Sequence, residues 1–176
     1  MSPWKHVLEC RRDNQFTPDV PTLDRMEWHY IFVYGSLKKG FPNHDYLEEE
    51  DIISRGAHTT GNTWELREVA GEKDSIPYMQ YTSVPSRQGH VCGEVYRVST
   101  KIICDLDALE TNGSLYHRVF VPIIISTHTK QSLPMWTWIG NKPYLERVFS
   151  NHPYSTIKDV RPTGRIGKQY YVWSKK

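Results

Sequence analysis

Apolar residues along this chain gather in short runs and alternations typical of β-strands, with one stretch at helical spacing. Four strands are predicted over residues 29–35, 91–98, 116–126 and 135–139. Between the second and third of these, Ser99 offers a helix N-cap, and the pattern of residues 101–110 predicts a helix. Residues 76–81 predict a shorter strand, which Pro77 would confine to the edge of a sheet. The pattern therefore indicates a mainly β domain that carries a helix.

The remaining segments are harder to assign, and they set the expected domain boundaries. Residues 1–28 are polar and contain three prolines, so we expect an extension that lies on the domain or is partly disordered. The domain itself is predicted over residues 29–157. Residues 158–176 carry six basic residues against one acid and predict a segment packed on the domain or trailing it. A solvated tail is favoured there over a phosphate-binding one. Residues 56–90 are interpreted as rich in turns, apart from the short strand.

The composition is that of a single soluble domain. The chain has 176 residues, of which 38% are hydrophobic, and its mean hydropathy is -0.61. A formal net charge of +2 is too small to argue for a nucleic-acid partner. No apolar run approaches the roughly 18 residues of a membrane span, and residues 1–6 lack the apolar core of a signal peptide. We therefore expect neither a nucleic-acid nor a membrane partner.

The cysteines and histidines indicate neither a disulfide framework nor a metal site. Cys10, Cys92 and Cys104 are odd in number and lack metal-ligand spacing. The eight histidines are scattered, without an HExxH pattern. A reducing compartment, the cytoplasm, is therefore favoured. The spacing of Cys104 and His117 does not support a nucleophile–base pair.

The first strand ends in the turn Tyr34-Gly35-Ser36-Leu37, which is the most informative stretch of the chain. Turns of this kind leave backbone N–H groups free to hold an anion or a developing negative charge. The second glycine of a phosphate-binding P-loop is followed by Lys and Ser or Thr, but here Phe41-Pro42 follows it. The Gly-x-Ser-x-Gly nucleophile elbow is absent as well. The turn therefore predicts an anion-holding element without nucleotide chemistry.

Glu110 breaks the apolar pattern of the predicted helix. At about 100° per residue, with Ile102 set at about 0°, Glu110 falls near 80°, inside the arc of core-facing residues. Burial there and the negative end of the helix dipole would raise its pKa from about 4.3 toward the 6–7 useful for acid–base catalysis. The alternative is that the helix has already ended, so that Glu110 turns to solvent or pairs with Arg118.

Four motifs in order resemble the gamma-glutamylcyclotransferase superfamily, also called AIG2-like. They are Phe32–Leu37, Gly93–Tyr96, Leu106–Glu110 and Leu115–Arg118. The resemblance covers roughly residues 30–126. The stretch Lys38–His44 resembles the gamma-glutamylamine cyclotransferase branch, although Ser36 stands where threonine is common in that branch. Residues 56–75, which should help to shape the pocket, match poorly.

The resemblance implies an α+β fold, a mixed β-barrel flanked by helices. It also implies a reaction without metal or organic cofactor, in which the α-amine of a gamma-glutamyl group attacks its own side-chain carbonyl. The products are 5-oxoproline and a free amine. The expected substrate is a gamma-glutamyl amine such as gamma-glutamyl-ε-lysine, and the alternatives are another gamma-glutamyl amide or a non-catalytic binding module. A monomer or weak dimer is expected.

The resemblance also implies roles for particular residues. Glu110 would be the general acid and base of the reaction. The substrate would be bound by Tyr34, Gly35, Ser36, Leu37 and Tyr116. For Tyr116, packing within the strand is an equally good interpretation. Arg118 is expected to hold the barrel together or to pair with a carboxylate.

Overall fold

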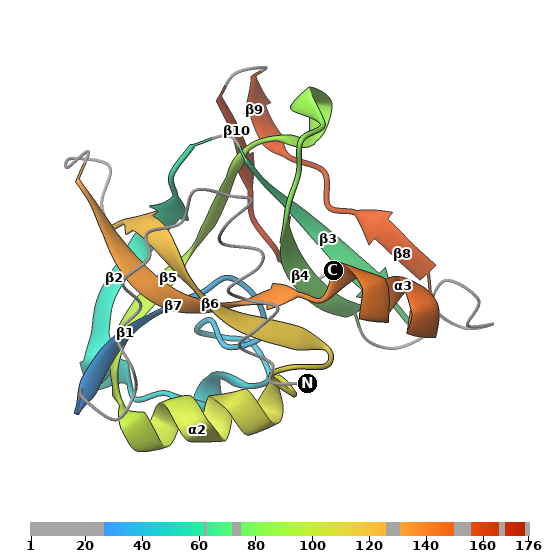
Figure 1. Ribbon diagram of the computed structural model, residues 1–176. Coiled ribbons are helices and arrows are strands. Elements are labelled where there is room, and N and C mark those ends of the chain that lie inside the picture. Colours follow the sequence, from blue (N-terminus) through green and yellow to red (C-terminus); the bar gives the residue numbers. More distant parts are fainter. Residues whose placement is uncertain are drawn as a thin grey trace.

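The computed structural model describes residues 27–61, 63–71, 75–125, 131–149, 156–165 and 168–174 (Figure 1). The predicted N-terminal extension falls almost entirely outside the described residues. The boundaries predicted for the domain, after residue 28 and after residue 157, stay predictions.

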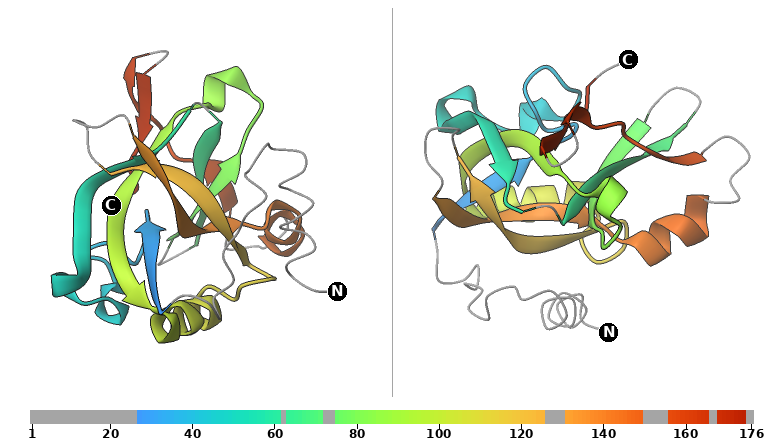
Figure 2. Two further views of the ribbon diagram at one scale, coloured as in Figure 1. Left: turned by 60° about the vertical axis from the view of Figure 1, so that its left-hand side comes forward. Right: turned by 90° about the horizontal axis from the view of Figure 1, so that it is seen from above.

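Five strands close into a barrel. They are β1 (Trp28–Val33), β2 (Ile52–Thr59), β5 (His90–Ser99), β6 (Tyr116–Ile124) and β7 (Ser132–Gly140). Hydrogen-bonded neighbours follow the order β1-β7-β6-β2-β5, and β5 pairs again with β1. The β1–β7 pair is parallel, whereas the other pairs in the ring are antiparallel (Figure 2). The predicted mixed β-barrel is confirmed.

A second, smaller sheet lies beside the barrel. Its order is β4 (Ser75–Tyr81), β3 (Trp64–Ala70) and β8 (Thr156–Asp159). β4 occupies an edge, as Pro77 predicts. The small sheet approaches the barrel closely at Gly140, where an added Cβ would collide with the ring of Tyr78. Glycine at this position therefore allows β4 to pack against β7.

The segments predicted as irregular contain several of these strands. The interpretation of residues 56–90 as mostly turns is wrong, because the second half of β2, all of β3 and the first residue of β5 fall within it. The favoured solvated C-terminal tail is also wrong. β8, β9 (Thr163–Arg165) and β10 (Lys168–Tyr171) come from this part of the chain, and β10 pairs with the start of β5. Long-range pairing supplies the order that the local pattern does not show.

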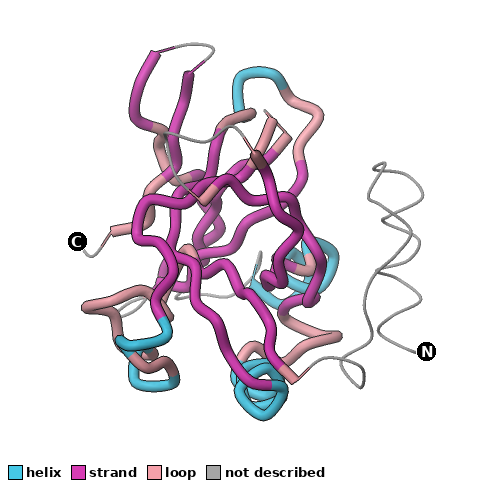
Figure 3. The backbone as a smooth tube through the Cα atoms, turned by 90° about the vertical axis from the view of Figure 1, so that its left-hand side faces the viewer, coloured by secondary structure: helices cyan, strands magenta, loops and turns pink. Residues whose placement is uncertain are grey.

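Helix α2 (Thr100–Leu109) matches the predicted helix, and it packs against β1 and β5 (Figure 3). The Ser99 hydroxyl accepts a hydrogen bond from the N–H of Ile102 at 3.4 Å, which is the expected N-cap. Ile103 and Leu106 are fully buried and anchor α2 to the core. Helix α3 (Lys142–Phe149) follows β7 and contacts β8. Short 3-10 turns cover His44–Tyr46, Glu49–Asp51 and Pro85–Arg87.

Candidate active site

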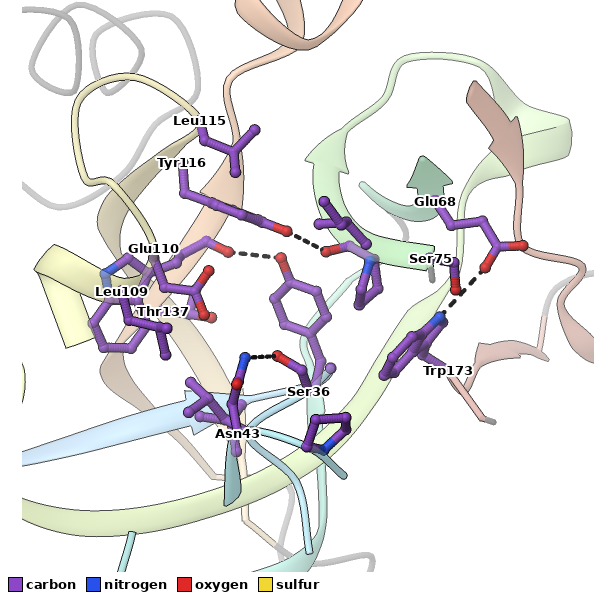
Figure 4. A pocket seen from close by; sticks show the side chains of 18 of the residues that line it. Ser36, Asn43, Glu68, Ser75, Leu109, Glu110, Leu115, Tyr116, Thr137 and Trp173 are labelled. Carbon is purple, nitrogen blue, oxygen red and sulfur yellow. Dashed lines mark hydrogen bonds between the residues drawn. The ribbon is translucent and has the colours of Figure 1, made fainter. Parts of the chain in front are cut away.

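A cavity of about 740 Å³ lies where the barrel meets the small sheet. Its wall is made by the turn after β1, the end of α2, the start of β6, and parts of β3, β4, β7 and β8. Residues after β10 complete it. Each predicted site residue lies in this wall: Tyr34, Gly35, Ser36, Leu37, Glu110 and Tyr116. Figure 4 labels Ser36, Glu110 and Tyr116 among them. Residues far apart in sequence are thus brought together, while their roles in chemistry stay predictions.

The turn after β1 is held by its own backbone and by Asn43. The Lys38 N–H donates to the carbonyl of Gly35, and the Asn43 N–H donates to the carbonyl of Ser36, both at 3.0 Å. The Asn43 side-chain amide also donates to the Ser36 hydroxyl at 2.9 Å. Within the described part of the chain, no group accepts a hydrogen bond from the N–H of Gly35, Ser36 or Leu37. Three consecutive amides, all of residues that line the cavity, are therefore without a protein acceptor among the described residues.

Gly35 is required by its contact with Pro77. A Cβ built at position 35 would lie 2.6 Å from the Cγ of Pro77. Because the proline ring is rigid, any side chain at position 35 would push the turn away from β4. The close approach of these two residues explains why this turn carries glycine, although the φ of Gly35 is not positive.

Tyr34 links the barrel to the small sheet beneath the cavity. Its hydroxyl donates to the carbonyl of Trp138 on β7 at 2.7 Å and accepts from the N–H of Met79 on β4 at 2.9 Å. Burial raises the pKa of Tyr34 above its ordinary value, so the phenol stays protonated. The donor and acceptor capacities of this hydroxyl are therefore both engaged by the protein.

Tyr116, at the start of β6, forms a second link between the barrel and β4. Its hydroxyl donates to the carbonyl of Pro77 at 2.6 Å (Figure 4). Burial raises the pKa of Tyr116 well above its ordinary value. The two interpretations from sequence are compatible, because Tyr116 packs in the strand while its ring also lines the cavity.

Glu110 sits at the C-cap of α2 and lines the cavity. Its N–H donates to the carbonyl of Leu106 at 2.8 Å, so the hydrogen bonds of the helix extend to this residue, although the helix itself ends at Leu109. Burial raises the pKa of Glu110 from 4.5 to about 7. Burial is one of the two causes of a raised pKa that the sequence predicted for Glu110, the other being the helix dipole. The result is a carboxyl group that can both accept and release a proton near neutral pH.

Arg118 does not pair with Glu110, contrary to the alternative raised from sequence. Its Nε donates to Oδ1 of Asp107 at 2.8 Å, and the indole of Trp138 donates to the same oxygen at 2.9 Å. The guanidinium carbon lies 4.3 Å from the ring centroid of Trp136. Arg118 thus ties α2 to β6 and β7, which confirms the expectation that it pairs with a carboxylate and holds the barrel.

The cavity residues that sequence reasoning missed include Glu68 on β3, Lys158 on β8, and Trp173 after β10. The Glu68 carboxylate accepts from the Trp173 indole at 3.4 Å and lies 3.4 Å from the Lys158 ammonium. These residues come together only through pairing of distant strands. No short-range signal in the sequence points to them.

Neither a metal cluster nor a membrane helix is found in the part of the chain that the structure describes. There, His, Cys, Asp and Glu form no group of three or more that could hold a metal ion. No helix among these residues is long and apolar enough to cross a membrane. Cys92 and Cys104 are free thiols, whereas Cys10 lies outside the described residues.

Similar proteins carry consistent names. A gamma-glutamylaminecyclotransferase C of Danio rerio is 36% identical over 101 residues, which are 57% of this chain and 65% of that protein. A gamma-L-glutamyl-butirosin B gamma-glutamyl cyclotransferase of Niallia circulans is 28% identical, over 74% of this chain and 80% of its own length. A crystal structure of an AIG2-like protein from Mus musculus is 25% identical, with a TM-score of 0.51, over 86% of this chain and all of the other.

Residues 31–156 match the family described as gamma-glutamyl cyclotransferase, AIG2-like. The matched region contains the turn after β1, the end of α2 and the start of β6, which hold all of the site residues predicted from sequence. Because the match covers well over half of the 176 residues, the protein belongs to the gamma-glutamyl cyclotransferase, AIG2-like family.

Proposed function

We propose that the protein is a gamma-glutamylamine cyclotransferase, which converts a gamma-glutamyl amine such as gamma-glutamyl-ε-lysine into 5-oxoproline and a free amine. One observation carries this proposal. The carboxyl group of Glu110, with a pKa of about 7, shares a cavity with the three available amides of the turn after β1. Family membership and the name of the Danio rerio relative support the same reaction.

In the proposed mechanism, Glu110 carries two protons, one after the other, from the attacking nitrogen to the leaving nitrogen. The ionised carboxylate accepts a proton from the α-ammonium group of the substrate, and the resulting amine attacks the side-chain carbonyl carbon. A new C–N bond closes the five-membered ring. The protonated Glu110 then donates its proton to the leaving nitrogen, and the original C–N bond breaks as the carbonyl forms again. The ring nitrogen gives its second proton to Glu110, which passes it to the released amine. Glu110 returns to its ionised form, and no water is consumed.

The amides of Gly35, Ser36 and Leu37 supply the other half of the proposed site. Attack places negative charge on the carbonyl oxygen, and preorganised N–H donors stabilise such charge. Loss of one such donor typically costs about 2.7–4 kcal/mol of transition-state stabilisation. The same donors are suited to hold the substrate α-carboxylate. Binding the substrate with its amine folded toward its carbonyl adds an entropic advantage.

Two other functions are alternatives to this proposal. The first is the same reaction on another gamma-glutamyl amide, and it is favoured by the match to the butirosin enzyme of Niallia circulans. The second is a non-catalytic module that holds a small anionic ligand. Glu110 argues against the module, because a buried negative charge weakens the binding of an anion.

The experiment is an assay of 5-oxoproline release by the full chain from gamma-glutamyl-ε-lysine, gamma-glutamyl-alanine and other gamma-glutamyl compounds. The proposal predicts that gamma-glutamyl-ε-lysine releases 5-oxoproline with a higher kcat/KM than the other compounds. A higher value for a gamma-glutamyl amino acid favours the first alternative. Binding of these compounds without release of 5-oxoproline favours the second.

A further inference from the structure

The Asn43 side chain lies in the cavity wall but has no role in the mechanism proposed above. Its Nδ2 donates a hydrogen bond to the Oγ of Ser36, in the turn after β1, at 2.9 Å. Figure 4 shows this contact in the wall of the cavity that Glu110 also lines. The pair of Asn43 and Ser36 is therefore placed to act on whatever the cavity binds.

The backbone around Asn43 holds this amide next to Ser36. The Asn43 N–H donates to the carbonyl of Ser36 at 3.0 Å, so the two residues are joined through the main chain as well. The loop between them turns back at Gly40, whose φ of 82° favours glycine. The Nδ1 of His44 lies 3.0 Å from the carbonyl of Leu37, within hydrogen-bond distance. The Asn43 amide is thus preorganised with respect to the Ser36 hydroxyl.

The hydrogen bond from Asn43 determines what the Ser36 hydroxyl can do. A hydroxyl has one proton to donate and two lone pairs to accept with. The Asn43 amide uses one lone pair, and an N–H group cannot accept the hydroxyl proton in return. Among the residues that the structure describes, no group accepts a hydrogen bond from this hydroxyl. Its proton is therefore available to an acceptor bound in the cavity.

The neighbouring groups indicate the kind of acceptor. The backbone N–H groups of Gly35, Ser36 and Leu37 also lack an acceptor in the described part of the chain. The Ser36 hydroxyl adds a side-chain donor to these three amides. Several donors gathered on one turn, without acceptors of their own, suit an oxygen that carries negative charge.

On the basis of the proposed function, we propose that Asn43 is a positioning residue, which turns the Ser36 hydroxyl proton toward an anionic oxygen of the gamma-glutamyl substrate. This oxygen is the side-chain carbonyl oxygen, as it becomes negative during attack, or an oxygen of the α-carboxylate. Asn43 does not touch the substrate in this role. It acts by making Ser36 a donor of fixed direction.

Replacing Asn43 by aspartate tests this role, because it reverses the hydrogen bond. An ionised carboxylate can only accept. In Asn43→Asp, the carboxylate therefore takes the Ser36 proton, and the hydroxyl presents a lone pair to the cavity. Asn43→Ala leaves the hydroxyl free to rotate. Ser36→Ala removes the donor, whereas Ser36→Thr keeps it.

Each variant is prepared as the full chain, and Asn43→Asp and Asn43→Ala are also combined with Ser36→Ala. The assay measures kcat and KM for 5-oxoproline release from gamma-glutamyl-ε-lysine. Both constants are taken from the plateau of each pH profile, so that a changed pKa of Glu110 does not enter the comparison. Urea unfolding shows which variants are folded.

Ser36→Ala should lower kcat/KM about 10- to 100-fold, as expected for a lost hydrogen bond to a charged group. Ser36→Thr should stay within about threefold of the wild type. Asn43→Asp should cost about as much as Ser36→Ala, and Asn43→Ala should cost less. In the Ser36→Ala background, Asn43→Asp should cost no more than about threefold, because no hydroxyl remains to be turned. The control Gln131→Glu makes the same amide-to-carboxylate change at an exposed position outside the cavity, and it should have no effect.

The division of the loss between kcat and KM identifies the anionic oxygen. A fall in kcat at constant KM assigns the hydrogen bond to the carbonyl oxygen in the transition state. A rise in KM at constant kcat assigns it to the α-carboxylate. Either result supports the positioning role, provided that the effect of Asn43→Asp depends on the Ser36 hydroxyl.

Three results would overturn the positioning role and leave the proposed function standing. They are wild-type kcat/KM in Ser36→Ala, wild-type kcat/KM in Asn43→Asp, and equal losses from Asn43→Asp with and without the Ser36 hydroxyl. The last would indicate an effect of added charge or of loop structure. If Asn43→Asp does not fold, Asn43→Ala completes the same cycle under the same criteria. Absence of 5-oxoproline release by the wild type from every gamma-glutamyl compound overturns the proposed function, and this inference with it.

Discussion

The Glu94 carboxylate on β5 accepts a hydrogen bond from the backbone N–H of Lys39 at 2.6 Å. This contact joins the strand motif around Gly93 to the loop that follows the turn after β1. Arg55 donates to the other oxygen of Glu94 at 2.6 Å and also pairs with Glu49. Glu94 is thereby buried with both oxygens engaged, and the loop is fixed from outside the cavity.

Glu94→Gln should loosen this loop, because the charged partner of Arg55 and of the Lys39 amide is lost. We expect a loss of about 1.5–3 kcal/mol in the free energy of unfolding. The KM for the best gamma-glutamyl amide should rise, because the turn is less preorganised. Chemical denaturation and steady-state kinetics measure both effects. The exposed Glu50→Gln is the control, and an equally small effect of both substitutions would contradict this role of Glu94.

Gly35→Ala should displace the turn from β4. The added Cβ would lie 2.6 Å from Pro77 Cγ, whereas at Gly56 it would meet nothing within 4 Å. We expect Gly35→Ala to cost about 1–3 kcal/mol of stability and to lower kcat, because the amides shift. Gly56→Ala should stay within about 0.5 kcal/mol of the wild type. Thermal melts measure the change in stability, and the 5-oxoproline assay measures kcat. A Gly35→Ala enzyme with wild-type kcat would contradict the importance of this turn.

Tyr34→Phe should destabilise the protein more than Tyr116→Phe. The first leaves both the Trp138 carbonyl and the Met79 N–H without the phenol, while the second affects only the Pro77 carbonyl. At about 1–3 kcal/mol for each buried group left unpaired, the loss should be roughly twice as large for Tyr34. Urea unfolding gives the comparison, with the exposed Tyr30→Phe as control. Equal losses at positions 34 and 116 would contradict the double role of the Tyr34 hydroxyl.

The elements predicted from sequence were those in which the local pattern agrees with the tertiary structure. β1, β5, β6 and β7 are apolar because they line the barrel core, and α2 carries an N-cap signal at Ser99. The placement of Glu110 at the cavity also followed from the pattern, because one polar position inside an apolar helix face is visible in sequence.

The elements that sequence analysis missed depend on distant partners. β2, with the sequence Ile-Ile-Ser-Arg-Gly-Ala-His-Thr, shows little alternation and pairs with β5 through two register shifts. β3 contains Glu65 and Glu68, which are buried although their residue type suggests the surface. Trp173 reaches Glu68 from 105 residues away in sequence. The part of the cavity wall that β3, β8 and the residues after β10 supply therefore had no local signal.

Stability should depend on pH through Glu110. Its pKa is raised from 4.5 in the unfolded chain to about 7 in the folded one, so the folded protein binds this proton more tightly. The stability from this group is complete below pH 4.5 and is lost as pH rises through 7. Glu110→Gln removes this dependence. Between pH 4.5 and pH 8, the free energy of unfolding of the mutant should therefore rise by about 3 kcal/mol relative to that of the wild type. Urea unfolding at pH 4.5 and pH 8 measures this; a constant difference would contradict the raised pKa.

The central claim is that Glu110 transfers the proton, and 5-oxoproline release by Glu110→Gln tests it most directly. The wild-type kcat/KM should fall on the acid side with an apparent pKa of about 7. Glu110→Gln should lose at least about 100-fold in kcat, with substrate affinity within about threefold of the wild type and no inflection near pH 7. A Glu110→Gln enzyme that keeps the wild-type kcat and pH profile would contradict the account.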